Sequence, residues 1–286
     1  DLARLAPGFA DSPGWRPLVL VLGLGTMLAG GWRAVREYDL KLLLAFSTVS
    51  QLGLMIALVG AGTGNLMLAG LAVVCAHAAS KAALFMVVGI IDHATGTRDV
   101  RELAGLGRRH PTLLMIGVAA AASMAAVPPF VGFVAKETAF AVLGELPEPA
   151  GTAAVVAVVL GSVFTVIYSL RFLWGAFAGK GRTAASTRVA AATPPAGWFY
   201  STPALLAGAG LVLGLQAGRL NTVLHGYADT LAGGADYHLA LWHGLGLPVA
   251  LSALVLLGGT TVFLTSRPLQ LTRLRRLPLG NADRIY

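Results

Sequence analysis

The sequence is poor in charge and almost free of cysteine. Only 12% of its 286 residues are Asp, Glu, Lys or Arg, about half the share of a typical soluble domain. The single cysteine, Cys75, excludes an intrachain disulfide and a metal site built from several cysteines. Because 56% of the residues are hydrophobic, the composition is typical of a polytopic membrane protein rather than of a large soluble enzyme.

Motifs of soluble enzymes are also missing from the sequence. No hydrolytic triad, nucleotide loop or metal-ligand cluster is visible, so we expect no enzyme activity, no cofactor and no metal. The glycine-rich run GLGTMLAGG, residues 23–31, lies inside an apolar segment and lacks the βαβ setting of a nucleotide site. We expect its small residues to let two helices pack closely.

Long apolar runs are what the sequence has in abundance. A helix that crosses about 30 Å of hydrocarbon needs about 20 apolar residues. Several segments reach this length, and the connections between them are short and rich in Gly, Pro and charges. We therefore predict an all-α polytopic membrane protein with about seven transmembrane helices. The predicted spans are residues 17–35, 40–60, 65–91, 111–145, 151–177, 201–218 and 240–265.

Basic residues are concentrated in alternate connections. The net charge of +8 would suggest nucleic acid as a partner of a soluble protein. Here most of the 21 Lys and Arg residues fall on one predicted side of the membrane, which the positive-inside rule assigns to the cytoplasm. We therefore expect a lipid bilayer and no nucleic acid. The basic segments are 33–41, 93–110, 178–200 and the tail from 266, and the other side holds Arg4, Arg16 and Arg219.

Lys81 lies near the middle of the apolar run 66–91. At 1.5 Å per residue it is about 15 Å from the nearer end, where a charge costs about 2.5–3.5 kcal/mol on insertion scales. His77 lies one helical turn earlier on the same face. Because desolvation disfavours the ammonium form and histidine titrates near neutral pH, the pair predicts a two-step proton relay. The alternative is a lysine paired with a carboxylate that only locks helices together.

A second charged pair follows two prolines in AAVPPFVGFVAKETAF, residues 125–140. Pro128 and Pro129 lack N–H groups and therefore predict a break in the fourth span. Broken helices line wet cavities and recur at transport sites. We expect Lys136 to face an ion path and Glu137 to brace a neighbour or contact water. The alternative is a simple proline kink with a charged pair at a helix end.

A polar strip occupies YDLKLLLAFSTVSQLGLM, residues 38–55. Asp39 is a suitable N-cap for the helix that follows. The strip predicts either hydrogen bonds between helices or a hydrated path, and the residues alone do not favour one. Lys41, near the cytoplasmic surface, is a weak candidate by itself. The four polar residues of the strip are Ser47, Thr48, Ser50 and Gln51.

Three histidines lie in or beside the last outer connection, at His225, His238 and His243. Their spacing is too irregular for a zinc site. We expect them at a hydrated surface or an interface.

Three stretches in this order resemble the antiporter-like subunits shared by respiratory complex I and multisubunit cation/proton antiporters. They are DLKLLLAFSTVSQLGLM, HAASKAALFMVVGIIDHATGTRD and VPPFVGFVAKE. The similarity covers roughly residues 16–180. Two stretches, ALFMVVGIIDHATGTRD and YHLALWHGLGLPVALS (237–252), resemble the A subunit of Mrp-type Na⁺/H⁺ antiporters in particular.

The resemblance implies a fold of two inverted five-helix repeats, each with one broken helix, of which this chain holds the second and further helices. It implies that Lys81 and His77 belong to a central line of titratable groups. Lys136 would mark the outer opening of the path, and Lys41 its cytoplasmic start. Val73 stands where related complex I subunits often carry another histidine. The first repeat, with its glutamate–lysine pair, is absent, so the chain holds half of a route.

The chain begins with Asp1 and shows no signal peptide, so we expect it to continue a missing N-terminal part. The predicted divisions are an outer-side segment 1–15, the antiporter-like second repeat 16–180, a cytoplasmic linker 181–200, two additional transmembrane helices 201–266 and a basic cytoplasmic tail 267–286.

The resemblance further implies other antiporter subunits as partners in a hetero-oligomeric complex of the bacterial inner membrane, with H⁺ and Na⁺ as the transported ions. An alternative is a proton-pumping membrane subunit of complex I or of a membrane-bound hydrogenase. A third interpretation is a membrane scaffold with inert buried lysines.

Overall fold

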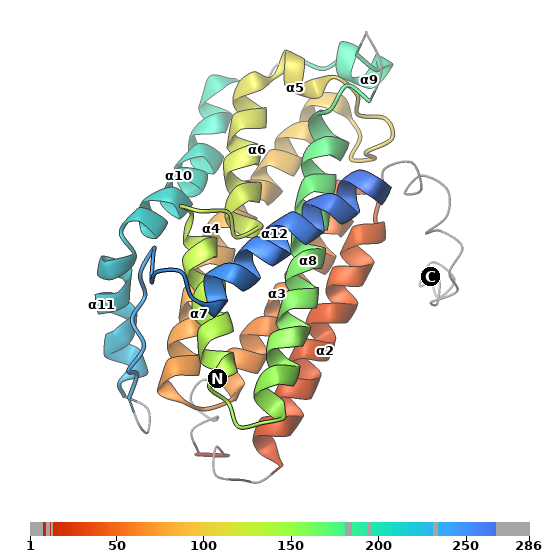
Figure 1. The fold of residues 1–286 in the computed structure, drawn as a ribbon. Helices are drawn as coiled ribbons and strands as arrows, with labels where there is room; N and C mark the ends of the chain where they lie inside the picture. The colour runs from red at the N-terminus through yellow and green to blue at the C-terminus, as the bar shows by residue number, and fades with distance from the viewer. Residues whose placement is uncertain are drawn as a thin grey trace.

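The computed structural model describes residues 8–9, 12, 14–180, 185–193, 196–230 and 234–266. The predicted basic tail 267–286 and most of the predicted outer segment 1–15 lie outside these residues. All the long elements of the described chain are helices (Figure 1). They are α2 (Trp15–Arg36), α3 (Leu40–Gly60), α4 (Gly64–Thr95), α5 (Leu106–Arg109), α6 (Pro111–Met124), α7 (Val131–Gly144), α8 (Ala150–Phe177), α9 (Thr187–Ala190), η1 (Gly197–Tyr200), α10 (Ser201–Leu215), α11 (Ala217–Ala228) and α12 (Leu247–Ser266).

The predicted spans correspond to these helices in outline. Six helices of the described chain are long and apolar enough to cross a membrane, and the fourth predicted span is the pair α6 and α7. The last span differs, because α12 begins at Leu247 rather than at residue 240. Gly244, with a φ of 88°, and Gly246 precede it, and glycine favours turns over helix. Residues 234–246 are therefore a non-helical segment outside the helix.

Side-chain and glycine signals set the helix ends. The Asp39 carboxylate accepts the amides of Lys41, at 2.7 Å, and Leu42, at 3.0 Å, and so caps α3 as predicted. The Thr63 hydroxyl caps α4 through the amide of Leu66. Gly96, with a φ of 67°, ends α4 in the left-handed conformation that glycine adopts without strain.

The glycine-rich run of α2 packs against α3 at backbone distance. A Cβ at Gly23 would lie 2.7 Å from the Ala57 nitrogen, and a Cβ at Gly30 would lie 2.6 Å from the Ser50 nitrogen. Any larger residue would push the helices apart. The predicted role of these small residues in close packing is confirmed.

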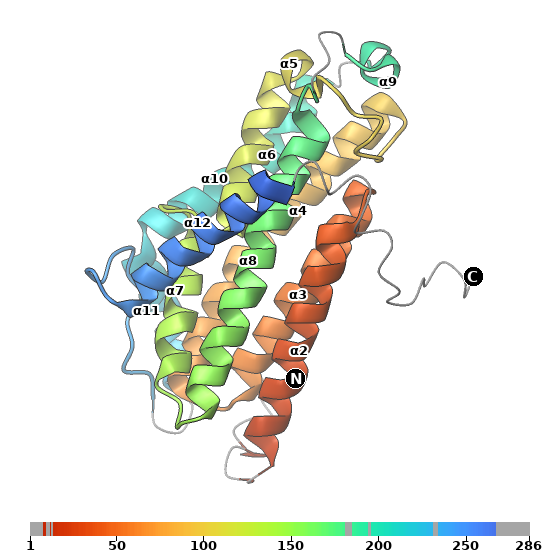
Figure 2. The ribbon, with the colours of Figure 1, turned by 45° about the vertical axis from the view of Figure 1, so that its right-hand side comes forward.

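The remaining helices surround α4 and α8. Figures 1 and 2 show α12 lying obliquely across α8 and α7, while α10 and α11 flank α4 on another side. The crossing of α12 over α8 is close, because a Cβ at Gly259 would lie 2.7 Å from the Val166 side chain. This arrangement places α7, with its charged pair, inside the bundle.

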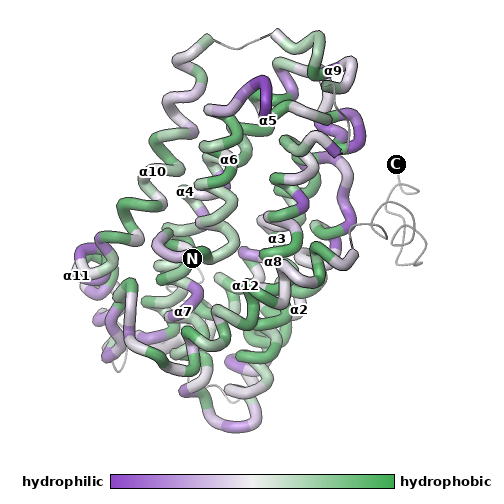
Figure 3. Tube along the Cα trace, turned by 45° about the horizontal axis from the view of Figure 1, so that its top comes forward, coloured by the Kyte–Doolittle hydropathy of each residue, from purple (hydrophilic) through white to green (hydrophobic). Residues whose placement is uncertain are grey.

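The basic connections meet at one end of the bundle, called the basic end below. The amide of Leu40 donates to the Arg98 carbonyl at 3.0 Å, and the amide of Ser186 donates to the Ala104 carbonyl at 3.0 Å. Hydrophilic stretches gather around α5 and α9 at this end and around α11 at the other end, whereas the long helices are mostly hydrophobic (Figures 1 and 3). The predicted clustering of basic loops on one side therefore holds for the described loops.

Candidate functional site

Lys81 lies inside the bundle, with only 4% of its surface exposed. Its Nζ donates hydrogen bonds to the Ser47 hydroxyl and, at 3.4 Å, to the Leu44 carbonyl, both on α3. It also lies 5.7 Å from the centroid of the Tyr168 ring on α8, which is within the range of a cation–π interaction. The ammonium is thus held by neutral groups.

No ion pair among the described residues includes either buried lysine, Lys81 or Lys136. A lysine that only locks helices needs a carboxylate partner to offset its desolvation. That alternative finds no support in the described chain. Among the described residues, loss of a proton from either amine would therefore leave no carboxylate unpaired.

A buried polar group joins α3 to α8 beside Lys81. The Gln51 amide donates to the Thr165 hydroxyl and to the Tyr168 hydroxyl, each at 3.3 Å. The Tyr168 hydroxyl in turn donates to Thr165 at 3.1 Å. Because Tyr168 touches both the Lys81 ammonium and Gln51, these contacts carry a polar connection away from the lysine.

The predicted helix break is present. Helix α6 ends at Met124 and α7 begins at Val131, so Pro128 and Pro129 lie in the irregular segment between them. Two glycines let this segment pack tightly. A Cβ at Gly132 would lie 1.8 Å from the Ser123 carbonyl oxygen, and one at Gly214 of α10 would lie 2.1 Å from the Pro129 oxygen.

Lys136 follows the break on α7 and is 6% exposed. Its Nζ makes no hydrogen bond to any described residue. It borders two small cavities, of about 20 Å³ and about 10 Å³. A site needs roughly 10–15 Å³ of such volume to hold one water molecule, so the larger cavity accepts a water beside the amine.

The larger cavity connects the two lysine regions. Gln51 and His77 line it together with Lys136, so the polar group beside Lys81 reaches the same space as the second amine. Its other polar neighbours include Ser80 and Ser123. His77 and Lys136 thus share one cavity, and Lys81, which does not line it, is joined to it through Tyr168 and Gln51.

Several hydroxyls around the cavities have no protein partner. Ser123 lines the larger cavity, and Ser162 and Ser252 line the smaller one beside Lys136. The hydroxyl oxygen of each is buried without a hydrogen bond to a described residue. Because buried polar groups are normally satisfied by protein or ordered water, a water in the larger cavity can bond the Ser123 hydroxyl beside the Lys136 amine.

Glu137, the residue after Lys136, lies beside a histidine of the 234–246 segment. It is 1% exposed, and its Oε1 lies 3.6 Å from Nδ1 of His243 in the 234–246 segment. Its Oε2 has no described partner. This agrees with the expectation that adjacent residues on a helix face different ways, with Glu137 bracing a neighbour.

Lys41 and Thr48 do not join the buried group, whereas Ser50 contacts it through a hydrogen bond with Tyr168. Lys41 is exposed at the first turn of α3. The Thr48 hydroxyl donates to the Leu44 carbonyl at 2.9 Å, and the Ser50 hydroxyl donates to Met27 of α2 at 2.7 Å. Of the polar strip, only Ser47 and Gln51 face the buried lysines. A pathway role stays a prediction for every one of these residues, Ser47 and Gln51 included.

Sequence reasoning missed the contribution of α8 and α12. Tyr168, Thr165 and Ser162 come from α8, and Ser252 comes from α12. One signal was available, because Ser162, Thr165 and Ser169 are spaced three and four residues apart and therefore share a helical face. Ser252 offered no such pattern.

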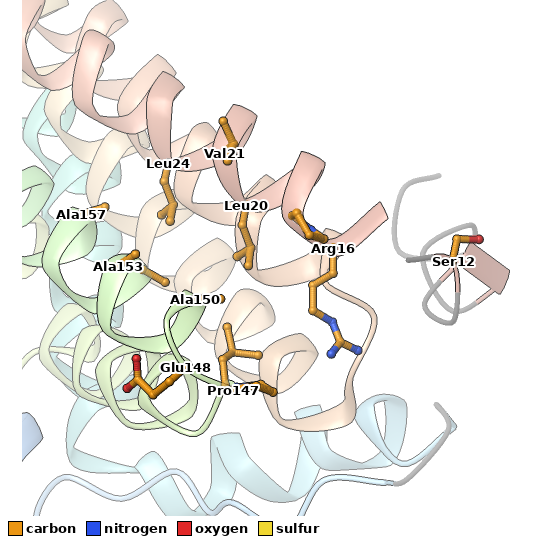
Figure 4. A pocket seen from close by; sticks show the side chains of 13 residues that line it. Ser12, Arg16, Leu20, Val21, Leu24, Pro147, Glu148, Ala150, Ala153 and Ala157 are labelled. Atoms are coloured by element: carbon orange, nitrogen blue, oxygen red, sulfur yellow. The ribbon is translucent and has the colours of Figure 1, made fainter. Parts of the chain in front are cut away.

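A larger groove, of about 590 Å³, lies between α2 and α8. Figure 4 shows Leu20 and Leu24 of α2 facing Ala153 and Ala157 of α8, with Arg16 nearby. It is lined by none of the residues predicted for the site, so the candidate site is the buried lysine group.

Comparisons with known proteins identify the family to which the chain is related. The family model described as NADH:quinone oxidoreductase/Mrp antiporter, TM, matches residues 2–165. A probable K(+)/H(+) antiporter A/B subunit of Rhizobium meliloti (strain 1021) is 37% identical over 271 residues, which cover 93% of this chain and 27% of the relative. The Na(+)/H(+) antiporter A subunit of Bacillus subtilis (strain 168) is 33% identical over 290 residues, covering 92% of this chain and 36% of the relative.

Solved structures show the same likeness. The Mrp complex from Dietzia sp. DQ12-45-1b contains a chain with a TM-score of 0.86 and 34% identity, covering 99% of this chain and 31% of that one. Respiratory complex I from Thermus thermophilus contains a chain with a TM-score of 0.66 and 24% identity, covering 76% of this chain and 44% of that one, a likeness of fold alone. This chain spans about a third of the length of the curated relatives it matches.

Proposed function

Because the chain belongs to the NADH:quinone oxidoreductase/Mrp antiporter transmembrane family, we propose that it carries part of the proton pathway of a cation/proton antiporter subunit. It is a membrane-embedded protein with several spans. The observation that carries the proposal is the pair of buried lysines without a carboxylate partner among the described residues, joined through polar side chains and a cavity.

Protons move in this proposal between two amines that can each be charged or neutral. At Lys81, the Ser47 hydroxyl, the Leu44 carbonyl and the Tyr168 ring stabilise the ammonium form. When the proton leaves, no carboxylate among the described residues is stranded. Water in the cavity beside His77 then takes the proton towards Lys136. Like charges on both amines repel, so a proton arriving at one favours release from the other.

The exchanged ion and the partners follow from the relatives. We propose Na⁺ as the cation, since the relatives of Bacillus subtilis and Staphylococcus haemolyticus are named Na(+)/H(+) antiporter subunits. The partners are other subunits of a hetero-oligomeric antiporter in the bacterial inner membrane, with the basic end in the cytoplasm. In this proposal the chain is a transport component and not an enzyme.

The test uses the full-length protein in its complete complex, in membrane vesicles with a pH indicator. We expect Lys81→Ala and Lys136→Ala to abolish proton movement on addition of Na⁺ while the complex assembles normally. Cys75→Ala on α4 is the matched control, because Cys75 lies near His77 in sequence but lines neither cavity.

Each other outcome has a defined meaning. Full transport by both lysine variants would contradict the proposal, and loss of assembly without any other defect would favour the scaffold interpretation. Transport with K⁺ but not with Na⁺ would keep the pathway and change the cation, as the name of the Rhizobium meliloti relative suggests for that protein.

A further inference from the structure

The 234–246 segment is fixed against the end of the bundle opposite the basic end. The Asn65 side chain on α4 accepts the amides of Asp236, at 2.8 Å, and Tyr237, at 3.0 Å. The amide of Leu239 donates to the Asn221 side chain of α11 at 2.8 Å. A segment with no regular secondary structure is thus anchored to two helices, which fixes the position of its side chains.

These anchors place His243 against Glu137. Its Nε2 lies 2.7 Å from the His238 carbonyl, and its Nδ1 lies 3.6 Å from Glu137 Oε1. A carbonyl only accepts hydrogen bonds, so Nε2 carries the hydrogen. In the neutral ring, Nδ1 therefore presents a lone pair to the Glu137 carboxyl group. The ring can accept a proton there without turning.

The two groups differ sharply in their access to solvent. The His243 side chain is 31% exposed, whereas the Glu137 side chain is 1% exposed. Glu137 follows Lys136 in the chain, and the Lys136 amine borders both cavities whereas Glu137 lines neither. The imidazole thus stands between a buried carboxyl group and the solution.

We propose that His243 passes protons between Glu137 and the solution at the end opposite the basic end. This inference rests on the proposed function and adds the step by which protons pass between the pathway and the solution. A protonated Glu137 gives its proton to Nδ1, leaving a carboxylate and an imidazolium. The imidazolium then turns so that its Nδ1–H reaches water at the exposed edge, loses that proton to water, and turns back neutral with the Nε2 hydrogen again on the His238 carbonyl. The carboxylate is protonated again from the Lys136 side.

The other titratable groups near the ring do not replace it. Tyr237 packs against His243 with ring centroids 5.2 Å apart. Burial, with the charges of Glu137 and Glu145, raises the pKa of Tyr237 to about 12, so the phenol keeps its proton at neutral pH. The His238 ring packs against His225 instead, at 5.7 Å. His243 is therefore the imidazole that lies against Glu137.

The experiment measures antiport by the complete complex at varied pH on the side of the vesicle that the 234–246 segment faces. His243→Gln retains an amide for the His238 carbonyl but does not titrate. We expect it to lower the rate about 100-fold or more, the low end of what a positioned proton-transfer group contributes. We also expect it to flatten the pH profile, and added imidazole to restore the rate. His238→Gln, an exposed histidine of the same segment, should keep the normal rate and profile.

Two results would overturn the inference. One is an unchanged rate and pH profile in His243→Gln. The other is a lowered rate with the normal pH profile and no response to imidazole, which would mean that His243 only holds the segment in place. If His243→Gln does not assemble, His243→Asn with the shorter amide is measured in the same way. If Lys81→Ala and Lys136→Ala lose transport and His243→Gln does not, this inference alone is rejected. If the two lysine variants keep transport, the proposed function is rejected.

Discussion

His77 on α4 and Lys136 on α7 line the same small cavity, although a helix break and two connections separate them along the chain. Gln51 of α3 borders that cavity and also contacts Tyr168, which lies under the Lys81 ammonium. The residues just named come from four helices and meet in one buried polar region. The following predictions test what each part of it does.

Arginine at the lysine positions should separate charge from proton exchange. Arginine keeps the positive charge but does not release its proton in proteins. We expect Lys81→Arg and Lys136→Arg to assemble and to lose antiport by about 100-fold or more. The measurement is Na⁺-dependent proton movement in vesicles, with complex yield as the control for assembly. Normal transport by either variant would mean that only its charge is needed.

The Tyr168 hydroxyl should matter apart from the ring. Tyr168→Phe keeps the aromatic face below Lys81 and removes the hydroxyl that contacts Gln51 and Thr165. We expect a loss of about 1 kcal/mol in stability and slower antiport, because the polar connection to the cavity is interrupted. Thermal unfolding of the complex and vesicle transport measure the two effects. Equal loss in Tyr168→Leu would show that the ring contributes nothing.

The helix break should depend on Gly132. Its Cβ would lie 1.8 Å from the Ser123 carbonyl oxygen, a backbone atom that cannot move aside. We expect Gly132→Ala to destabilise the protein by about 1–3 kcal/mol or more, seen as a lower unfolding temperature of the complex. Gly89→Ala is the matched control, because nothing lies within 4 Å of a Cβ at that position of α4. Equal behaviour of the two variants would contradict the close packing.

The anchoring of the 234–246 segment should depend on pH through His225. A hydrogen bond to Asp229, at 3.0 Å, raises the pKa of His225 above its usual value, and the same contact lowers the pKa of Asp229. The His225 contribution is complete below about pH 6.5 and is lost as the pH rises through its raised pKa. The Asp229 contribution is complete above about pH 4 and is lost as the pH falls through its lowered pKa.

Hydrogen exchange of the amides of residues 235–237 measures this effect. After correction for the intrinsic pH dependence of exchange, we expect the strongest protection between about pH 4 and pH 6.5. Asp229→Asn should remove the loss of protection above that window. A wild-type protection that stays constant as the pH rises to alkaline values would show that the Asn65 and Asn221 contacts hold the segment by themselves.

Much of the site was visible in the sequence. A lysine in the middle of an apolar run is costly enough to require a polar interior, so Lys81 and Lys136 could be selected without a structure. The proline pair predicted the break between α6 and α7, because each of the two prolines lacks the N–H group that a helix needs as a donor. The sequence could not assign the contacts of the polar strip inside the bundle. Ser47 and Ser50 are only three residues apart, yet the Ser47 hydroxyl bonds the Lys81 amine and the Ser50 hydroxyl bonds the Met27 carbonyl. The division into a repeat, a linker and additional helices stays a prediction.

The sequence by itself determined the membrane class, the spans in outline, the helix break and the two buried amines, because hydrophobic length, proline chemistry and the cost of burying charge are local properties. Only the tertiary structure decided which groups meet those amines. Tyr168, Ser252 and His243 reach the site from α8, α12 and a non-helical segment. Contacts between distant segments depend on how helices cross, and no spacing along the chain specifies that geometry.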